Sequence, residues 1–279
     1  MASLNEQEAQ RLLAGIVIPP RPTVVTAIME ERAREDPDLR RIGALIAADV
    51  ALAAAVLKTV NSPLYGFKRQ VSDIDQAVSL LGMSNIATLV TGLALRSGVP
   101  AHGLDRFWDS AARTALVSAF VAKELGCLTP TEAHLFGLFR DCGIPLMLAR
   151  FGDYKDSLRL ANAEARRAFT DVEDDRHATN HAVVGSLLAA NWNLSEDLRA
   201  AIRSHHDLGV YQSAISPKAM NLVAVGVLAE YIENNYSRLA TGHEWVKLGE
   251  ATLAHLMLDA PALEELSGDA RAALEESGL

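Results

Sequence analysis

Apolar residues recur at spacings of three and four along most of the chain, and few stretches alternate with a period of two. The first pattern places apolar side chains on one face of an α-helix, whereas the second is typical of a β-strand. Aromatic residues make up only 5% of the chain, and alanine and leucine are abundant, which suits closely packed helices. We therefore predict an all-α protein with helices at about residues 4–15, 22–35, 38–48, 50–60, 73–82, 84–97, 104–125, 131–149, 153–166, 177–192, 195–206, 216–235, 244–256 and 261–276.

A cluster of glycine and proline at residues 97–103 interrupts this helical pattern. Such clusters are typical of linkers between packed segments. We expect a multi-helix bundle of two packed helical subdomains, with the first at residues 1–100 and the second at 101–210. Residues 211–279 are expected to add helices that complete the bundle.

Charge and hydropathy narrow the class of protein. The chain has 26 basic and 35 acidic residues, a net charge of −9, which disfavours a nucleic-acid partner because phosphate binding needs a basic face. The first ten residues are polar and acidic, unlike a signal peptide. The longest apolar run, at 42–57, is interrupted by Asp49, and the run at 85–95 is too short for a bilayer. We expect a cytoplasmic protein with no membrane partner, whose Cys127 and Cys142 stay reduced.

Histidines supply the first candidate chemistry. His177 and His181 are four residues apart in a predicted helix, so they share a face on which two metal ligands could sit. His177 follows three acidic residues and is expected to be solvated at a helix start. His205 and His206 are neighbours in the next predicted helix, where adjacent side chains point about 100° apart. At most one of them is therefore expected to enter any given pocket.

The segment GLFRDCGI at residues 137–144 has the form of a metal-site segment, a buried helix with an acid in its last turn. However, Arg140 stands before Asp141 where a histidine would suit a metal. Acids and histidines on successive helices, including Glu230 in a later apolar helix, can converge inside a bundle. No HExxH motif is present, because Ala178 occupies the glutamate position, and neither a Walker loop nor a GxSxG motif occurs.

Several short motifs follow one another in a specific order: IPPRP at 18–22, IAADVAL at 46–52, VLKTVNS at 56–62, IDQAV at 74–78, FW at 107–108, GLFRDCG at 137–143, HAVVG at 181–185, WNL at 192–194 and AIRSHH at 201–206. This order resembles the HDOD family, bacterial signalling relatives of the HD-domain metal phosphohydrolases. The resemblance covers about residues 14–207. It implies an HD-like helical fold for the second half of the chain and a role in signal transduction.

The resemblance also assigns the positions of an HD metal site, which has a first histidine, a His-Asp pair, further histidines and a closing acid. In that order they are Ser110, Arg140, Asp141, His181, His205, His206 and Glu230. Serine is a poor ligand, and the guanidinium of Arg140 has no lone pair and adds positive charge. Arg140 is expected to pair with Asp141 or Glu230 instead. With ligands lost at Ser110 and Arg140, we expect no metal, no other cofactor and no catalytic residue.

Other residues of the matching motifs are expected to be structural: Asp49, Asn61, Ser62, Gly82, Trp108 and Trp192. Asp49 interrupts an apolar helix and should cap it or find a buried partner. Asn61 precedes Ser-Pro at a helix end and should cap backbone groups of the turn. Gly82 should close a helix, and the two tryptophans should anchor the core.

These observations favour a non-catalytic HDOD-type regulatory protein that acts through contacts with unidentified signalling proteins. One alternative is a residual metal phosphohydrolase that uses Asp141, His181, His205, His206 and Glu230. A second is a nucleotide or small-ligand sensor, in which Arg140 would bind an anion in the former metal cavity. The oligomeric state is not predicted by the sequence.

Overall fold

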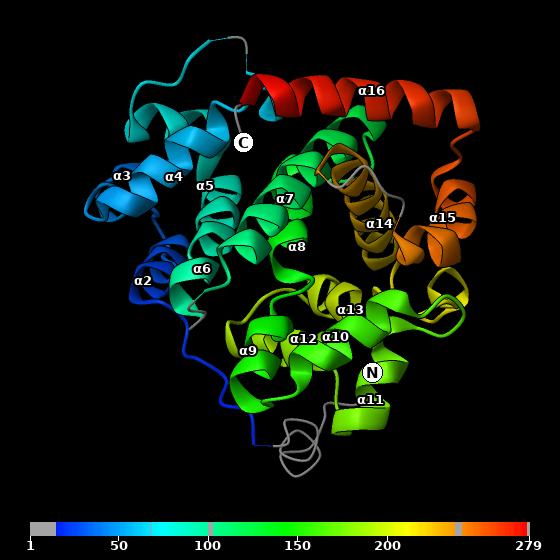
Figure 1. The fold of residues 1–279 in the computed structure, drawn as a ribbon. Helices are drawn as coiled ribbons and strands as arrows, with labels where there is room; N and C mark the ends of the chain where they lie inside the picture. Colours follow the sequence, from blue (N-terminus) through cyan, green and yellow to red (C-terminus); the bar gives the residue numbers. More distant parts are fainter. Residues whose placement is uncertain (1–14, 68, 100–102, 238–241, 278–279) are drawn as a thin grey trace.

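The computed structural model describes residues 15–67, 69–99, 103–237 and 242–277. These residues form helices joined by loops and contain no β-strand, so the all-α prediction is confirmed (Figure 1). The predicted helix at 4–15 lies outside the described residues, as do residues 100–102 of the predicted linker.

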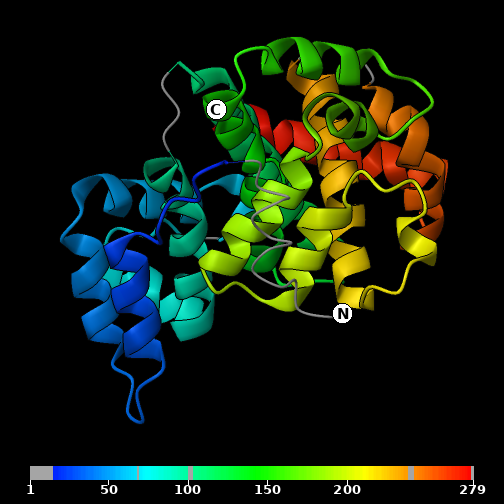
Figure 2. The same ribbon diagram turned by 90° about the horizontal axis from the view of Figure 1, so that it is seen from below.

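The first half of the chain forms a layer of helices at one side of the molecule, coloured blue to cyan in Figures 1 and 2. Its longest helix packs against three others of the layer, α2, α3 and α4. The elements are α2 (Thr23–Arg32), α3 (Leu39–Ala47), α4 (Val50–Val60), the short 3-10 helix η1 (Pro63–Tyr65), α5 (Ile74–Leu93) and α6 (Leu95–Gly98). We call these elements the N-terminal layer.

Polar side chains begin and end α4. Asp49 accepts a hydrogen bond from a backbone N–H of the first turn at 3.0 Å, which makes it the N-cap. At the other end, the side chain of Asn61 accepts from the N–H of Val71 at 2.7 Å and donates to the carbonyl of Val71 at 2.8 Å. Ser62 then accepts from a backbone N–H of η1 at 3.4 Å. Asn61 thus closes the loop between α4 and α5 by pairing with its backbone.

Gly82 breaks the helical backbone inside α5, as predicted, and leaves two helical stretches that meet at a kink. Its φ of 73° and ψ of 172° are not helical, and its positive φ is a conformation that glycine adopts without a Cβ clash. The sequence predicted one helix ending at 82 and another running to 97. The structure confirms the break at Gly82, but the stretch after the kink ends at Leu93 and the short α6 follows it.

By length and composition, α5 is the one helix among the described residues that could cross a membrane, with a mean hydropathy of 1.3 over its best window. In the structure it is kinked, carries buried residues such as Ile86 and Leu89, and packs against α3, α4 and α8. These contacts are typical of a core helix in a helical bundle.

In the second half of the chain, the helices α7 and α8 pack against each other at the centre, and the other helices lie around them (Figure 1). Seen from below, this half lies beside the N-terminal layer (Figure 2). Its elements are α7 (Asp105–Leu125), α8 (Pro130–Phe139), α9 (Gly143–Arg150), α10 (Tyr154–Ala163), α11 (Phe169–His177), α12 (His181–Asn191), α13 (Glu196–Ser204), the 3-10 helix η2 (Val210–Gln212), α14 (Pro217–Ser237), α15 (His243–Leu256) and α16 (Ala260–Ser277).

Two helix boundaries differ from the sequence prediction. The predicted helix at 131–149 is broken between Phe139 and Gly143 into α8 and α9. The predicted helix at 177–192 begins only at His181, because Ala178 adopts a left-handed conformation with φ of 55° and Asn180 caps the next helix through the N–H of Val183. The preceding helix, α11, was not predicted.

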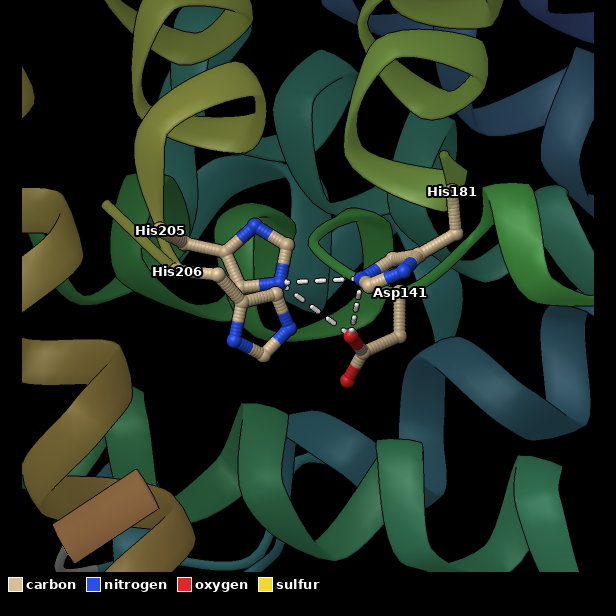
Figure 3. Close-up of side chains that lie close together, drawn as sticks. All are labelled: Asp141, His181, His205 and His206. Carbon is tan, nitrogen blue, oxygen red and sulfur yellow. Dashed lines mark hydrogen bonds and ion pairs between the residues drawn. The ribbon is translucent and has the colours of Figure 1, made fainter. Parts of the chain in front are cut away.

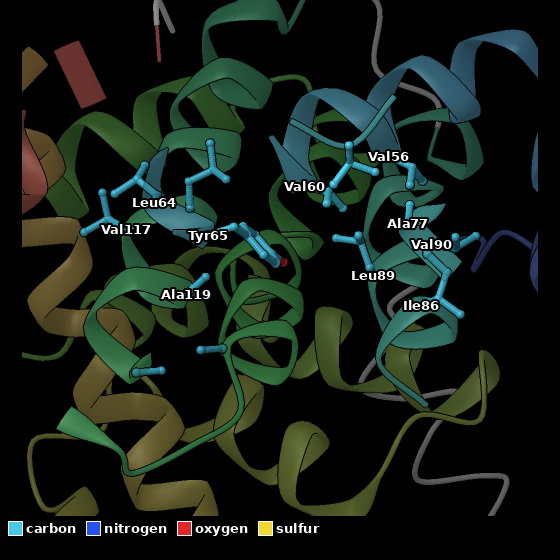
Figure 4. Packing of buried hydrophobic residues seen from close by; sticks show 14 of the residues in the cluster. Val56, Val60, Leu64, Tyr65, Ala77, Ile86, Leu89, Val90, Val117 and Ala119 are labelled. Atoms are coloured by element: carbon cyan, nitrogen blue, oxygen red, sulfur yellow. The ribbon is translucent and has the colours of Figure 1, made fainter. Parts of the chain in front are cut away.

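Buried apolar residues form two clusters that share α7. The first joins the N-terminal layer to one face of α7 and to α14 and α16, and Figure 4 shows part of it around Tyr65 and Leu89. The second fills the interior of α8 to α15 and includes Trp108 of α7. Helix α16 returns across the molecule to contact η1 and α7 (Figure 1). The C-terminal helices therefore pack on both halves of the chain.

Trp192 connects the extended N-terminal segment to the second cluster. Its ring is fully buried and meets the ring of Phe139 edge-on, with centroids 5.6 Å apart. The indole N–H donates to the carbonyl of Pro19 at 3.2 Å, and the guanidinium of Arg21 donates to the carbonyl of Trp192 at 3.4 Å. Trp108, 5% exposed, belongs to the same cluster.

We predict that Gly143→Ala lowers the free energy of unfolding by at least ~2 kcal/mol. A Cβ at Gly143 would lie 2.0 Å from the carbonyl oxygen of His181 and 2.9 Å from the nitrogen of Gly185, so α9 and α12 would have to separate. Urea unfolding followed by circular dichroism measures the change. Gly152→Ala is the matched control, because a Cβ there meets nothing within 4 Å. Equal stability of the two variants would contradict this account of the helix contact.

Candidate functional site

Four side chains converge where the loops and helix ends of the second half meet (Figure 3). One ligand atom from each of Asp141, His181, His205 and His206 lies within 4.8 Å of the others. Asp141 lies in the break between α8 and α9, His181 is the first residue of α12, and the other two histidines follow the last residue of α13. We call these four residues the histidine cluster.

Both members of the His205–His206 pair belong to the cluster, whereas the sequence analysis expected at most one to enter a given pocket; of the two, His206 lines the cavity beside the cluster. That expectation assumed a helix through residue 206, but α13 ends at Ser204. Beyond the helix the two rings lie together, with centroids 4.1 Å apart. The 100° rotation between helical neighbours does not apply to them.

His177 is not part of the cluster, and the prediction that it is solvated at a helix start was wrong. It is 8% exposed and lies at the end of α11, not in the helix of His181. Its Nε2 is 2.7 Å from the hydroxyl oxygen of Ser157, and its ring packs against Phe151 at a centroid distance of 4.4 Å. The acidic residues before it belong to α11.

Three ligand atoms of the cluster form a nearly equilateral triangle. The Nε2 atoms of His181 and His205 are 3.3 Å apart, and they lie 3.4 Å and 3.3 Å from Oδ1 of Asp141. The opposite ring nitrogens are already bound. Nδ1 of His181 is 2.7 Å from a carboxylate oxygen of Glu173, and Nδ1 of His205 is 2.7 Å from the carbonyl oxygen of Ile202. Each Nδ1 therefore carries a proton, so in a neutral ring Nε2 presents a lone pair to the triangle.

Such a triangle of lone pairs needs a proton or a cation between its members. Burial alone would lower the pKa of His181, but the carboxylates of Glu173 and Asp141 outweigh burial and raise it to about 10. A protonated His181 donates from both ring nitrogens, to Glu173 on one side and into the triangle on the other. The cluster can therefore satisfy itself with a proton.

Glu173 was missed by the sequence analysis, although it is fully buried. It also accepts a hydrogen bond from the hydroxyl of Tyr154. Burial opposes ionisation of Glu173, but the charge of His181 and the hydrogen bonds from His181 and Tyr154 lower its pKa. The helix that carries it has a run of acidic residues and weak apolar periodicity, so no local pattern marked this carboxylate as buried.

Arg140 occupies the side of the cluster next to α14. Its Nε donates to Oδ2 of Asp141 at 2.9 Å, its Nη2 to Glu230 at 2.7 Å, and its Nη1 to the carbonyl of Gly226 at 3.2 Å. The arginine side chain is 6% exposed, whereas those of Asp141 and Glu230 are 25% and 26% exposed. Although burial opposes it, the charge of Arg140 and hydrogen bonds from His181 hold the pKa of Asp141 well below its usual range.

His206 is fixed from its outer side. Its Nδ1 is 2.7 Å from a carboxylate oxygen of Glu244, and its ring stacks on Phe169 with centroids 4.8 Å apart. Burial and the charge of His205 lower the pKa of His206 to about 4. Glu244, which also pairs with Lys247, was not identified from the sequence because α15 follows α13 only after α14.

A cavity of about 350 Å³ opens beside the cluster. Of the residues assigned by the resemblance, all but His205 line it, including the position of the missing first histidine: Ser110, Arg140, Asp141, His181, His206 and Glu230. The residue-by-residue assignment of the site thus corresponds to one place in the fold.

Part of this donor set fits a metal ion. Ligand atoms about 2.0–2.1 Å from a tetrahedral ion lie roughly 3.3–3.4 Å apart, which matches the triangle. Glu173 and Ile202 stand behind the histidines as the second layer of partners usual for metal-bound imidazoles. The rest of an HD site does not fit, because Ser110 is a poor donor and Arg140 already binds Oδ2 of Asp141. The donors suit a single ion held by His181, His205 and Asp141, with His206 as the fourth residue of the cluster.

Comparison with known proteins places this fold among HD-like helical proteins. A candidate phosphohydrolase from Shewanella amazonensis SB2B shares it with a TM-score of 0.70 and 22% identity, covering 96% of this chain and 97% of that one. An HDOD domain protein from Geobacter sulfurreducens has a TM-score of 0.68 and 24% identity, with 96% of each chain covered. A candidate signal transduction protein from Marinobacter aquaeolei VT8 has a TM-score of 0.64 and 20% identity, covering 100% of this chain and 61% of that one. At these identities the likeness establishes the fold.

The family follows from the sequence match. The HDOD domain model matches residues 18–208, and an uncharacterized protein of Treponema pallidum (strain Nichols) is 30% identical over 196 residues. That match spans 68% of this chain and 38% of the longer Treponema protein. The chain belongs to the HDOD domain family.

We predict that Arg140→Met lowers the free energy of unfolding by about 3 kcal/mol, because it leaves two carboxylates, Asp141 and Glu230, without their partner. Chemical denaturation at neutral pH measures the loss. Arg106→Met is the control, since Arg106 is exposed and lines the same cavity, and its effect should stay within ~0.5 kcal/mol. An Arg140→Met variant as stable as the control would show that the bridge contributes little.

The pKa of His181 predicts a pH dependence of stability. A folded-state pKa of about 10 exceeds the unfolded value of roughly 6.5, so protonation of His181 stabilises the fold fully below the unfolded pKa. This contribution is lost as the pH rises through the folded pKa. The stability difference between the wild type and His181→Gln should therefore shrink on going from neutral to alkaline pH. A difference independent of pH would contradict the protonated state.

Proposed function

We propose that this chain is a non-catalytic HDOD regulatory module that acts through contacts with a partner signalling protein. The observation that carries the proposal is the bridge from Arg140 to both Asp141 and Glu230. The guanidinium places a permanent positive charge where a hydrolytic site would hold a divalent cation. Its hydrogen bonds satisfy the acids that such a cation would need as ligands.

Hydrolysis of a phosphate ester by an HD-type site needs a metal-bound water as the nucleophile. In this chain, Oδ2 of Asp141 is bound by Arg140, and Oδ1 faces the ring nitrogens of His181 and His205. The position of the first histidine is Ser110. The remaining donors hold one another, which supports a structural role for the cluster.

Signalling by protein contact is favoured by family membership, and one protein of the same fold is described as a candidate signal transduction protein. A sensor that binds an anion through Arg140 is less well supported. Each of the three guanidinium nitrogens already donates a hydrogen bond, to Asp141, Glu230 or the carbonyl of Gly226. A cytoplasmic location remains a prediction, as does the absence of a nucleic-acid partner.

Complementation of a deletion strain tests whether the role is catalytic. We predict that an Asp141→Asn, His205→Gln double variant restores the regulatory phenotype as well as the wild type does, provided circular dichroism shows that it is folded. The reason is that neither substitution alters the outer surface on which a partner would dock. If the folded double variant fails to complement and the wild type hydrolyses a phosphodiester, the non-catalytic proposal is wrong and the chain acts as an enzyme.

The triangle of His181, His205 and Asp141 supports a second candidate, a single bound transition-metal ion with a structural role. Elemental analysis of protein purified without chelator distinguishes the two. The main proposal predicts well under one equivalent of zinc, iron or manganese. One equivalent that disappears in His181→Gln but persists in His177→Gln would favour the metal-binding candidate, since His177 lies outside the cluster.

A further inference from the structure

A second cavity, of about 270 Å³, lies between the N-terminal layer and the central helices α7 and α8. It shares no lining residue with the cavity beside the histidine cluster. Helix α4 contributes Ala55, Lys58 and Thr59, and the end of α5 with α6 forms a second side. Helices α7 and α8 form the opposite side through Trp108, Leu116, His134 and Leu138, among others.

Most of the interior of this cavity is apolar. Leu95 is fully buried, and Trp108, Leu116 and Leu138 are 5%, 4% and 7% exposed. An indole ring with aliphatic side chains around it is a surface on which a flat apolar group packs well. The cavity is therefore suited to a ring and not to a strongly hydrated ligand.

One polar group in this apolar wall has no protein partner. His134 is 2% exposed, and its Nδ1 is buried without a hydrogen bond. The hydroxyl of Tyr65, whose ring lies edge-on to that of His134 at 5.8 Å, is likewise buried and unpartnered. Figure 4 shows Tyr65 within the packed core of the N-terminal layer. Buried polar groups are nearly always hydrogen-bonded, and His134 lines the cavity, so its imidazole is the polar group of this wall that a bound water or ligand would contact.

The rim of the cavity carries an uncommitted positive charge. Arg96 is held by Asp105 at 2.9 Å and by Asp109 at 3.8 Å. Lys58 is exposed on α4 and forms no ion pair with any residue that the structure describes. Asp105 and Asp109 balance the charges of Arg96 and Lys58 overall, but both acids are on the side of Arg96, so the ammonium of Lys58 is the charge that a ligand anion can pair with.

We propose that this cavity binds a small aromatic carboxylate that also carries a hydroxyl or ring N–H group. The ring packs against Trp108 and Leu138, the carboxylate binds Lys58, and the polar substituent bonds to His134. Burial lowers the pKa of His134 to about 3, so its ring is neutral and offers one donor and one acceptor. A volume of about 270 Å³ suits a molecule of on the order of ten heavy atoms.

A ligand at this place would contact both halves of the chain. Lys58 and Ala55 belong to the N-terminal layer, whereas Trp108 and His134 belong to the central helices. Because α4 and α8 line the cavity from opposite sides, the ligand would favour their present separation, and α8 leads directly to Arg140. The site is a place for a small-molecule input to a module that otherwise acts through protein contacts.

Binding of 4-hydroxyphenylacetate and indole-3-acetate to the full chain tests the proposal, with saturation-transfer NMR to detect contact and calorimetry to measure Kd. We expect Kd values in the micromolar to millimolar range, and about tenfold weaker binding of neutral 4-hydroxyphenylacetamide. Lys58→Gln should weaken the binding of both carboxylates by a similar factor. Lys155→Gln, an exposed lysine of α10 outside the cavity, should leave their Kd unchanged.

Filling the cavity gives the decisive control. Ala112→Phe and, independently, Ala55→Phe place a ring in the cavity from opposite sides, and either folded variant should abolish binding. Absence of binding of both carboxylates at millimolar concentration would overturn the proposal. So would binding that persists in a folded filled variant, because the ligand would then occupy another site. Neither result bears on whether the histidine cluster is catalytic.

Discussion

The bridge from the guanidinium of Arg140 to the carboxylates of Asp141 and Glu230 holds the centre of the second half together. It joins the end of α8 to α14, and Asp141 in turn faces the histidines at the ends of α12 and α13. A buried charge without a partner is costly, so each member of this network depends on the others. The polar groups at these helix ends are partners of one another, which stabilises their meeting at this place.

The bridge also gives the proposed non-catalytic role its physical basis. A divalent cation and a guanidinium compete for the same carboxylate oxygens, and an arginine supplied by the chain is always present. The protonated His181 completes the network by donating to Glu173 on one side and into the triangle with Asp141 on the other. In the proposed non-catalytic module, this proton and the guanidinium supply the positive charge that a metal ion supplies in a hydrolytic site.

Local signals predicted much of the fold, whereas contacts between distant helices could not be predicted. The roles of Asp49 as a helix cap and of Gly82 as a helix breaker depend only on residues close to them in the chain, so the sequence predicts them directly. Helix α11 was missed because its face toward the core is marked by Phe169 and a buried glutamate rather than by an apolar repeat. The partnership of Glu173 with His181 crosses the turn between α11, which was not predicted, and α12. Arg140 was the exception, because its chemistry alone required acidic partners.

The most direct test of the account restores the missing ligands. Ser110→His with Arg140→His would return a first histidine and a His-Asp pair to the cavity, and calorimetric titration with zinc or manganese would measure binding. The account predicts that the wild type binds neither ion with measurable affinity and that the double variant binds at least one. Stoichiometric binding by the wild type would contradict the claim that Arg140 takes the place of the metal, and so would a folded double variant that binds none.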